Sequence, residues 1–423
     1  MQVTLHTPAP RGALRAFPSK SEAHRALICA ALADAPTKIL CADTNDDIDA
    51  TIDCLCALGA DITRTKQGFL ITPIAHAPAY AQMDARESGS TLRFLLPVIA
   101  ALGTRAHIAR RGRLPARPLS PLRELLEQNG VSIAERGDGL LEIAGKLIGH
   151  DFSMTGEVSS QFVSGLLFAL PLLNSYDDCH IHLLGQVASR PYIDMTLGTL
   201  AAFGIRVQEQ DCMLRVPAHS RYTSPGTLPV GGDWSGAAAF ACMGALGKHP
   251  ITMTDIHPQS LQGDSAILSI LSQMGADVQI GTDKVTVSPA PLHGTEIDAT
   301  NIPDLVPVLA ATAALAQGKT RIYGASRLRL KESNRLFATT EVLRTLGADV
   351  TESDDGLIIV GKPTLTGGRV SSLGDHRIAM CAAVASLGCT CPVTVENAQA
   401  ITKSYPTFWE QLSALCTPDS VIL

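Results

Sequence analysis

The sequence has few charged and few aromatic residues, and it has no long apolar run. Of its 423 residues, 17% are charged, 4% are aromatic and 46% are hydrophobic, and the formal net charge is −6. Proteins that bind nucleic acid need a basic surface, and those that bind single strands also need aromatic rings for stacking. The composition therefore disfavours a nucleic-acid-binding module. The longest apolar runs, residues 94–102 and 305–316, are too short to cross a bilayer and are predicted to be buried helices.

Motifs for metals, nucleotides and nucleophilic catalysis are also absent. The eleven cysteines form no CxxC pair, only the CxC pairs Cys54/Cys56 and Cys389/Cys391. A structural zinc site needs four ligands at tighter spacing, so we expect reduced core cysteines. The sequence contains no P-loop, no GxGxxG fingerprint after a strand and no GxSxG elbow. We therefore expect catalysis by proton transfer and charge stabilisation. Because the first residues resemble no secretion signal, a cytosolic location is expected.

A unit of about seventy residues repeats along the chain. One marker is an apolar helix end, a glycine and a strand-like stretch, as in Leu58–Ile62; it occurs five times, with glycines 71 to 74 residues apart. Glycine there is typical of a helix that ends in the left-handed conformation. The other marker is a polar cluster that caps an apolar helix. It occurs six times, around Ser21, Ser90, Ser160, Ser235, Asp304 and Asp375.

Six such units predict two α/β domains of three units each. Apolar helices of this kind are buried inside a globular domain, which argues against an open solenoid. The chain is expected to pass between domains in the Pro- and Gly-rich segment 217–232 and again near residues 9–18. We therefore expect one discontinuous domain, 1–17 plus 230–423, and one inserted domain, 18–229.

The segment Arg327–Arg335 is the most unusual stretch, since five of its nine residues are charged. If a helix begins near Glu332, Lys331 and Arg335 project from one face of it, where two cations repel each other and oppose the helix dipole. A bound anion would relieve this repulsion, and Glu332 would be placed to move a proton. The segment 375–377 (Asp-His-Arg) adds a proton donor near neutral pH. The pattern predicts small polyanionic substrates; a solvated helix start is the alternative for each cluster alone.

Together these segments resemble the 5-enolpyruvylshikimate-3-phosphate synthases, a family of enolpyruvyl transferases. The match runs nearly from end to end, and its segments are 18–25, 88–93, 117–118, 159–162, 189–192, 304, 330–335, 375–380 and 403. Lys-Glu-Ser-x-Arg followed by Asp-His-Arg is a highly specific combination. The resemblance implies two globular domains, each of three βαβαββ units around buried parallel helices, with the active site in the cleft between the domains.

The resemblance also implies a reaction. The enolpyruvyl group of phosphoenolpyruvate would move to the 5-hydroxyl of shikimate 3-phosphate, with release of phosphate, by addition and then elimination through a tetrahedral intermediate. No metal or organic cofactor would be needed. The protein would be a cytoplasmic monomer with two small-molecule substrates and with neither a nucleic-acid nor a membrane partner.

Roles for individual residues follow from the same resemblance. Those implied in catalysis are Lys20, Asp304 and Glu332. Those implied in binding shikimate 3-phosphate are Lys20, Ser21, Arg25, Ser159, Ser160, Gln161, Ser189, Tyr192, Asp304 and Lys331. Those implied in binding phosphoenolpyruvate are Lys20, Gly89, Arg117, Gln161, Arg335, Arg377 and Lys403. The division of acid and base roles stays open, although Asp304 is the candidate to take the proton of the 5-hydroxyl.

Two positions depart from the family pattern. Glu87 stands where many relatives have Asn, and Arg327 stands where some relatives place an Asn that touches substrate. Both bear on substrate affinity and on the response to inhibitors that mimic phosphoenolpyruvate.

Two other functions compete with this interpretation. The UDP-N-acetylglucosamine enolpyruvyl transferases share the fold, but they typically carry Lys-Asn where this chain has Lys20-Ser21, and a reactive Cys in a loop that here, at residues 110–117, has none. A non-catalytic relative that only binds phosphorylated metabolites would not need the acid–base residues Asp304 and Glu332. We therefore expect an active transferase.

Overall fold

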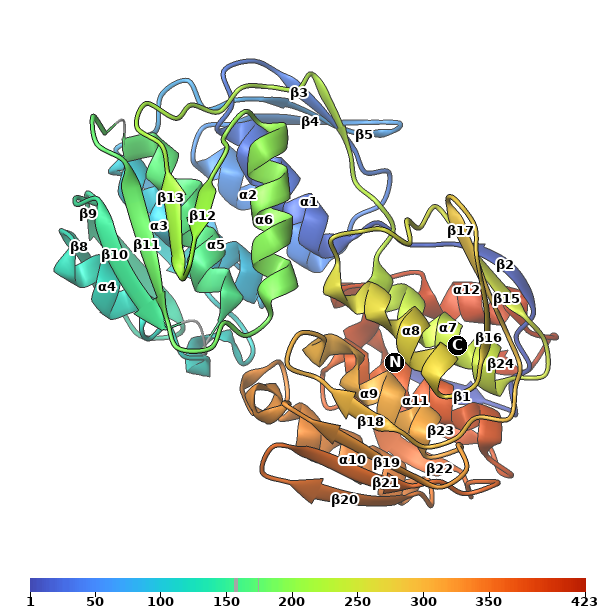
Figure 1. Ribbon diagram of the computed structural model, residues 1–423. Helices are drawn as coiled ribbons and strands as arrows, with labels where there is room; N and C mark the ends of the chain where they lie inside the picture. Colours follow the sequence, from blue (N-terminus) through green and yellow to red (C-terminus); the bar gives the residue numbers. More distant parts are fainter. Residues whose placement is uncertain (156–158, 174) are drawn as a thin grey trace. The chain divides into compact units, whose positions relative to one another are not determined.

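The computed structural model describes residues 1–155, 159–173 and 175–423 and separates into two compact units (Figure 1). The discontinuous unit comprises Met1–Phe17 and Gly231–Leu423, and the inserted unit comprises Pro18–Val230. Within the described residues, each unit contains three four-stranded sheets. The predicted α/β fold of repeated units is confirmed.

Each sheet of the inserted unit consists of one parallel pair of strands followed by two antiparallel pairs. In sheet order, the strands of the first sheet are β14 (Thr227–Pro229), β3 (Thr37–Leu40), β5 (Gly68–Thr72) and β4 (Asp61–Thr65). Those of the second sheet are β6 (Tyr80–Asp84), β7 (Arg105–Ala109), β9 (Leu140–Gly145) and β8 (Val131–Glu135). Those of the third sheet are β10 (Asp151–Thr155), β11 (Cys179–Leu184), β13 (Met213–Val216) and β12 (Gln208–Gln210). Its α-helices are α1 (Lys20–Ala31), α2 (Asp46–Ala57), α3 (Gly89–Leu102), α4 (Leu122–Gln128), α5 (Ser160–Ala169) and α6 (Arg190–Ala202).

The discontinuous unit repeats the same arrangement, with strands from both ends of the chain. In sheet order, the strands of its first sheet are β16 (Asp277–Ile280), β17 (Lys284–Ser288), β15 (Ile251–Thr254) and β2 (Gly12–Arg15). Those of the second sheet are β18 (Glu296–Asp298), β19 (Lys319–Tyr323), β21 (Gly356–Val360) and β20 (Asp349–Ser353). Those of the third sheet are β22 (Gly368–Ser371), β23 (Val393–Glu396), β1 (Gln2–Leu5) and β24 (Val421–Ile422). Its α-helices are α7 (Trp234–Leu246), α8 (Ile267–Gln273), α9 (Val306–Ala313), α10 (Arg335–Thr345), α11 (His376–Ala385) and α12 (Phe408–Leu415). The N-terminal strands β1 and β2 complete two of these sheets, which is why the unit needs both chain ends.

Helix ends follow the local signals in the sequence. The five repeated glycines all have positive φ, and they are Gly59, Gly130, Gly204, Gly275 and Gly347. The polar clusters also act as predicted at most helix starts: Ser19 caps α1, Ser88 caps α3 and Asp233 caps α7, each accepting a hydrogen bond from a backbone N–H of the first turn. The expected cap at Asp304 is wrong. That residue lies in the short 3₁₀ turn η4 (Pro303–Leu305) before α9, without a side-chain cap, and its carboxylate forms ion pairs instead.

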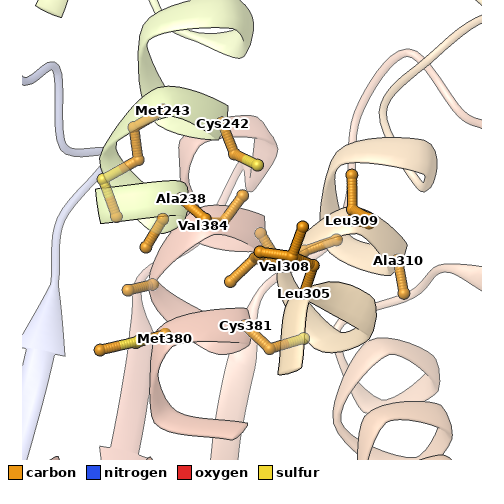
Figure 2. Packing of buried hydrophobic residues seen from close by; sticks show 14 of the residues in the cluster. Ala238, Cys242, Met243, Leu305, Val308, Leu309, Ala310, Met380, Cys381 and Val384 are labelled. Carbon is orange, nitrogen blue, oxygen red and sulfur yellow. The ribbon is translucent and has the colours of Figure 1, made fainter. Parts of the chain in front are cut away.

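The core of the discontinuous unit is built on three helices with small or apolar side chains all around. Figure 2 shows α7 contributing Ala238, Cys242 and Met243, α9 contributing Val308 next to Leu305 at the end of η4, and α11 contributing side chains that include Met380, Cys381 and Val384. On α7 every residue from Trp234 to Ala245 is buried. A helix without a polar face belongs inside a domain, as predicted from the apolar runs.

The placement of the cysteines agrees only in part with the prediction that they are core residues. All eleven cysteines are free, and seven are buried, but Cys56, Cys212 and Cys391 are exposed. In the residues that the structure describes, no helix is long and apolar enough to cross a membrane.

Helices α3 and α5 of the inserted unit approach each other closely at Gly165. A Cβ atom there would lie 2.4 Å from the carbonyl oxygen of Arg93 and 3.2 Å from Cγ of Pro97. Gly165→Ala is therefore expected to lower the free energy of unfolding, because overpacking costs about 1–3 kcal/mol while the gain in helix propensity is about 1 kcal/mol. Urea unfolding measures the change, with the exposed Ser272→Ala in α8 as control. A variant more stable than wild type would contradict the close contact.

Candidate functional site

Arg335, the first residue of α10, is buried among three carboxylates. Its Nη1 lies 2.7 Å from Oδ1 of Asp304, its Nη2 2.7 Å from Oε2 of Glu332, and its Nε 2.8 Å from Oδ2 of Asp375. Burial alone lowers the pKa of Arg335, but Asp375, Glu332 and Asp304 together raise it well above its ordinary value. We call Asp304, Lys331, Glu332, Arg335, Asp375 and Arg377 the Arg335 cluster.

Asp304 faces three cations of this cluster. Its Oδ1 lies 3.5 Å from Nζ of Lys331, and its Oδ2 lies 3.8 Å from Nη2 of Arg377. Burial raises the pKa of Asp304, but Lys331, Arg335 and Arg377 outweigh that effect and hold it well below its ordinary value. The side chain is still 19% exposed. Asp304 is thus an ionised, partly accessible carboxylate that can accept a hydrogen bond from a hydroxyl group.

The condition of a helix start near Glu332 is not met. Helix α10 begins at Arg335, where Asn334 is the N-cap and its side chain accepts a hydrogen bond from the N–H of Phe337. Lys331 lies before the helix in extended conformation, after the 3₁₀ turn η5 (Ser326–Leu330). The two cations therefore do not share a helical face, and the carboxylate of Asp304 lies between them. Their mutual repulsion is offset by acids of the protein, so it gives no separate argument for a bound anion.

Arg377, in the first turn of α11, is fixed by the neighbouring helix α7. Its Nη1 donates to the carbonyl oxygen of Ser235 at 2.7 Å, and its own N–H donates to Asp375, the N-cap of α11, at 2.9 Å. Its side chain is 3% exposed. His376 beside it is buried, as is Lys403 at the end of the 3₁₀ helix η7 (Ala398–Lys403). Buried cations near helix N-termini favour an anionic ligand.

In the inserted unit, Lys20 starts α1 and forms an ion pair with α2. Its Nζ lies 2.9 Å from Oδ2 of Asp47, and the two side chains are 15% and 7% exposed. A low-dielectric environment strengthens this pair. Asp47 was not identified from the sequence, since it lies 27 residues away in another helix and belongs to no motif that we recognised.

Arg25 connects α1 to α6. Its Nη1 and Nη2 donate to the carbonyl oxygens of Ser21 and Tyr192, each at 2.7 Å, and its Nε donates to Oγ1 of Thr196 at 2.8 Å. Burial lowers the pKa of Arg25 to about 10, which leaves it charged at neutral pH. Arg25 therefore brings together the segments that carry Ser21 and Tyr192. Its predicted direct contact with substrate stays a prediction.

Gln161 and the other predicted residues of α5 lie at the helix start. Ser159 is the N-cap and Ser160 is the first helical residue. Nε2 of Gln161 donates to Oγ of Ser90 at 2.9 Å, while its Oε1 accepts from Nη1 of Arg93 at 2.7 Å. These two bonds fix the amide between α3 and α5. Arg93 was part of a matching segment but had no predicted role.

Ser189 precedes α6 with φ = 56°, in the left-handed region that a non-glycine residue rarely occupies. Such a conformation costs about 1–3 kcal/mol and is concentrated at functional sites. Together with Tyr192, whose N–H donates to the carbonyl oxygen of Ser189 at 3.1 Å, it forms a tight turn at the helix start. The strain supports the predicted role of this turn in binding.

The guanidinium of Arg117 packs directly on the backbone of Gly89. A Cβ atom at Gly89 would lie 2.8 Å from Nη1 of Arg117. Gly89→Ala must therefore displace that guanidinium, and we expect the KM for phosphoenolpyruvate to rise about tenfold, the equivalent of one charge-assisted hydrogen bond. Steady-state kinetics with Gly89→Ala and the larger Gly89→Ser measures the effect, which should be greater for serine. An unchanged KM in both variants would contradict a role for this contact.

The two departures from the family pattern have identifiable surroundings. Glu87 packs on the loop that leads to Arg117, since a Cβ atom at Gly112 would fall 1.5 Å from Oε1 of Glu87. Gly112 is therefore required there, and its φ of 55° also favours glycine. Nη2 of Arg327 donates to the carbonyl oxygen of Thr300 at 2.7 Å and thus ties η5 to the segment before η4.

Metal chemistry has no support in the side chains that the structure places. Among residues 1–155, 159–173 and 175–423, no three His, Cys, Asp or Glu side chains are arranged to hold a metal ion. The chemistry available to both units consists of carboxylates, cations, hydroxyl groups and helix N-termini. That set is suited to binding phosphate and carboxylate groups and to proton transfer.

Comparison with known proteins identifies a family through a family model and curated relatives, and a shared fold through solved structures. The family model described as EPSP synthase (3-phosphoshikimate 1-carboxyvinyltransferase) matches residues 7–412. The 3-phosphoshikimate 1-carboxyvinyltransferase of Clostridium kluyveri is 40% identical over 98% of this chain and 97% of its own length, and that of Clostridioides difficile is 37% identical over 96% and 95%. Among solved structures, an EPSP synthase from Acinetobacter baumannii covers 98% of both chains with a TM-score of 0.82 at 24% identity. The enolpyruvyl transferase NikO from Streptomyces tendae covers 98% of this chain and 97% of its own with a TM-score of 0.76 at 19% identity, so these two likenesses concern the fold.

Proposed function

This chain belongs to the EPSP synthase family, and on that premise we propose that it transfers the enolpyruvyl group of phosphoenolpyruvate to the 5-hydroxyl of shikimate 3-phosphate and releases phosphate. The observation that supports this most directly is the Arg335 cluster. It combines an ionised carboxylate, Asp304, with a second carboxylate, Glu332, and with buried cations. Addition to an enol phosphate needs that combination, because a proton leaves the hydroxyl group while another joins the enol carbon.

The proposed binding roles divide between the two units. Residues of the inserted unit proposed to bind shikimate 3-phosphate are Lys20, Ser21, Arg25, Ser159, Ser160, Gln161, Ser189 and Tyr192. Asp304 and Lys331 of the discontinuous unit are proposed to contact its hydroxyl groups. Residues proposed to bind phosphoenolpyruvate are Lys20, Gly89, Arg117, Gln161, Arg335, Arg377 and Lys403. Because neither unit holds both sets, we propose that the two units act together on one pair of substrates and exclude water when they close on it.

The proposed reaction proceeds in two stages. In the first stage, the oxygen of the 5-hydroxyl bonds to C2 of phosphoenolpyruvate while Asp304 accepts the proton of that hydroxyl group. At the same time C3 gains a proton from Glu332 or Lys20. In the tetrahedral intermediate that results, C3 then returns a proton to Glu332 or Lys20, the C2–O bond to phosphate breaks and the double bond between C2 and C3 returns. The surrounding cations stabilise the charge on the phosphate as it leaves.

The remaining properties belong to the same proposal. We propose a monomer that acts in the cytoplasm, needs neither a metal nor an organic cofactor and has neither a nucleic-acid nor a membrane partner. The low aromatic content and the net charge of −6 agree with small-molecule substrates.

The test is phosphate release by the purified protein in the presence of a chelator. Phosphoenolpyruvate is supplied with shikimate 3-phosphate and, separately, with UDP-N-acetylglucosamine. Release with shikimate 3-phosphate alone is expected. Release only with the nucleotide sugar would replace the proposed acceptor, and binding of shikimate 3-phosphate without any release would favour a binding protein.

A further inference from the structure

Residues 262–264 are packed against the first turn of α7, next to the Arg335 cluster. The buried side chain of Gln262 accepts from the N–H of Trp234 at 3.0 Å and donates to the carbonyl oxygen of Gly232 at 2.8 Å. Asp264, in the 3₁₀ turn η3 (Gly263–Ala266), is 2% exposed, and its Oδ2 is hydrogen-bonded to Oγ of Ser235. This segment therefore determines where the first turn of α7 lies.

Ser235 links Asp264 to a proposed substrate-binding residue. Its hydroxyl contacts Asp264, and its carbonyl oxygen accepts the hydrogen bond from Nη1 of Arg377 at 2.7 Å. We call Asp264, Ser235 and Arg377 the Asp264 relay. Ser235 is itself buried, so the relay is shielded from bulk water.

Charged groups from three surrounding elements act on Asp264. They include Asp304 from η4, Arg377 from α11 and Asp233 from the start of α7, while helix α8, which follows η3, carries no charged residue. Burial, reinforced by Asp304, raises the pKa of Asp264 to about 7; Ser235 and Arg377 oppose the shift, and Asp233 adds to it. Near neutral pH, Asp264 is thus partly protonated and lies close to the ionised Asp304, and both acids interact with the guanidinium of Arg377.

We propose that Asp264 is a positioning residue that, as a neutral acid, holds Arg377 in place through Ser235, and that ionisation of Asp264 weakens the binding of phosphoenolpyruvate. A second carboxylate charge beside Arg377 offsets the positive charge that attracts the anionic substrate. The protonated acid keeps the hydrogen bond to Ser235 without adding that charge. This inference rests on the proposed function for the identity of the anion.

The kinetic test compares Asp264→Asn and Asp264→Ala with wild type between about pH 6 and about pH 9. Asparagine mimics the neutral acid, so its KM for phosphoenolpyruvate should be near that of wild type at the acidic end. As pH rises, the wild-type KM should increase about tenfold relative to that of Asp264→Asn, because only wild type gains the charge. Titration of the substrate and of other groups affects both proteins equally and cancels in the ratio.

Asp264→Ala and a distant charge change are the controls. Asp264→Ala removes the hydrogen bond and should raise KM at every pH, whereas the exposed Asp277→Asn should behave as wild type. A ratio of wild-type to Asp264→Asn KM that does not change with pH would overturn the proposal. So would an Asp264→Asn variant as impaired as Asp264→Ala, since a neutral acid would then not be what the relay needs.

Two readouts do not depend on activity. Infrared difference spectra between acidic and neutral pH should show the carbonyl band of a protonated acid in wild type that is missing in Asp264→Asn. The Tm advantage of Asp264→Asn over wild type should also grow between about pH 5 and about pH 7 and then level off. In this range the unfolded chain has lost the Asp264 proton while the folded protein still largely holds it, so rising pH lowers the stability of wild type relative to that of Asp264→Asn. If the carbonyl band and the Tm difference are both observed but no phosphate is released, the proposed function fails and the Asp264 relay stands. If the carbonyl band is absent from wild type, the Asp264 relay fails whether or not phosphate is released.

Discussion

Replacing Glu332 by glutamine is expected to lower kcat about 10²- to 10⁴-fold while the Kd of shikimate 3-phosphate changes by no more than about twofold. Glutamine has nearly the same shape, and its amide oxygen can still accept the hydrogen bond that Nη2 of Arg335 makes at 2.7 Å. It cannot give or take a proton. The loss should therefore appear in the chemical steps and not in ground-state binding.

Single-turnover kinetics and calorimetric titration of shikimate 3-phosphate separate these two effects. Glu341→Gln is the matched control, because Glu341 is an exposed residue of α10 and loses the same charge without entering the Arg335 cluster. Equal losses in kcat and in binding would contradict a role in proton transfer and would assign Glu332 to the support of Arg335.

Arg335→Ala is expected to have the largest effect on stability. The guanidinium is 2% exposed and pairs with Asp304, Glu332 and Asp375, whose side chains are between 0% and 19% exposed. Without it these carboxylates are left close together with insufficient positive charge. Removing one partner of a buried ion pair costs about 3–5 kcal/mol, and we expect a loss of this size in the free energy of unfolding.

Urea unfolding measures that loss, with Arg369→Ala as the control. Arg369 pairs with Glu396, but their side chains are 61% and 38% exposed, so this change should cost about 0–1 kcal/mol.

The stability lost in Arg335→Ala should depend on pH in one direction. In wild type, the depressed pKa of Asp304 means that its stabilisation is present above its ordinary pKa and is lost as pH falls. In Arg335→Ala the unpaired acids favour protonation, so its deficit relative to wild type should shrink as the pH is lowered. A pH-independent deficit would contradict the electrostatic explanation.

Local features of the fold could be predicted from the sequence because they depend on neighbouring residues. A glycine with positive φ ends a helix wherever it occurs in the repeat, and Ser or Asp caps the next helix within its own first turn. The helix cap expected at Asp304 was wrong for a related reason. Its side chain, which could act as a cap, accepts a hydrogen bond from Arg335, 31 positions away in another element.

By itself, the sequence determined the repeat, the buried helices, the α/β class and, through its motifs, the residues expected to bind substrate. Only the tertiary structure decided their partners: Asp47 for Lys20, Arg93 for Gln161, and Ser235, 142 positions away, for Arg377. The physical reason is that the charge state and orientation of a buried group depend on the distance to other charges and on the exclusion of water. Neither quantity is encoded in the spacing of residues along the chain. Asp264, which belongs to no motif, acquires a pKa of about 7 only because packing buries it and places it near Asp304.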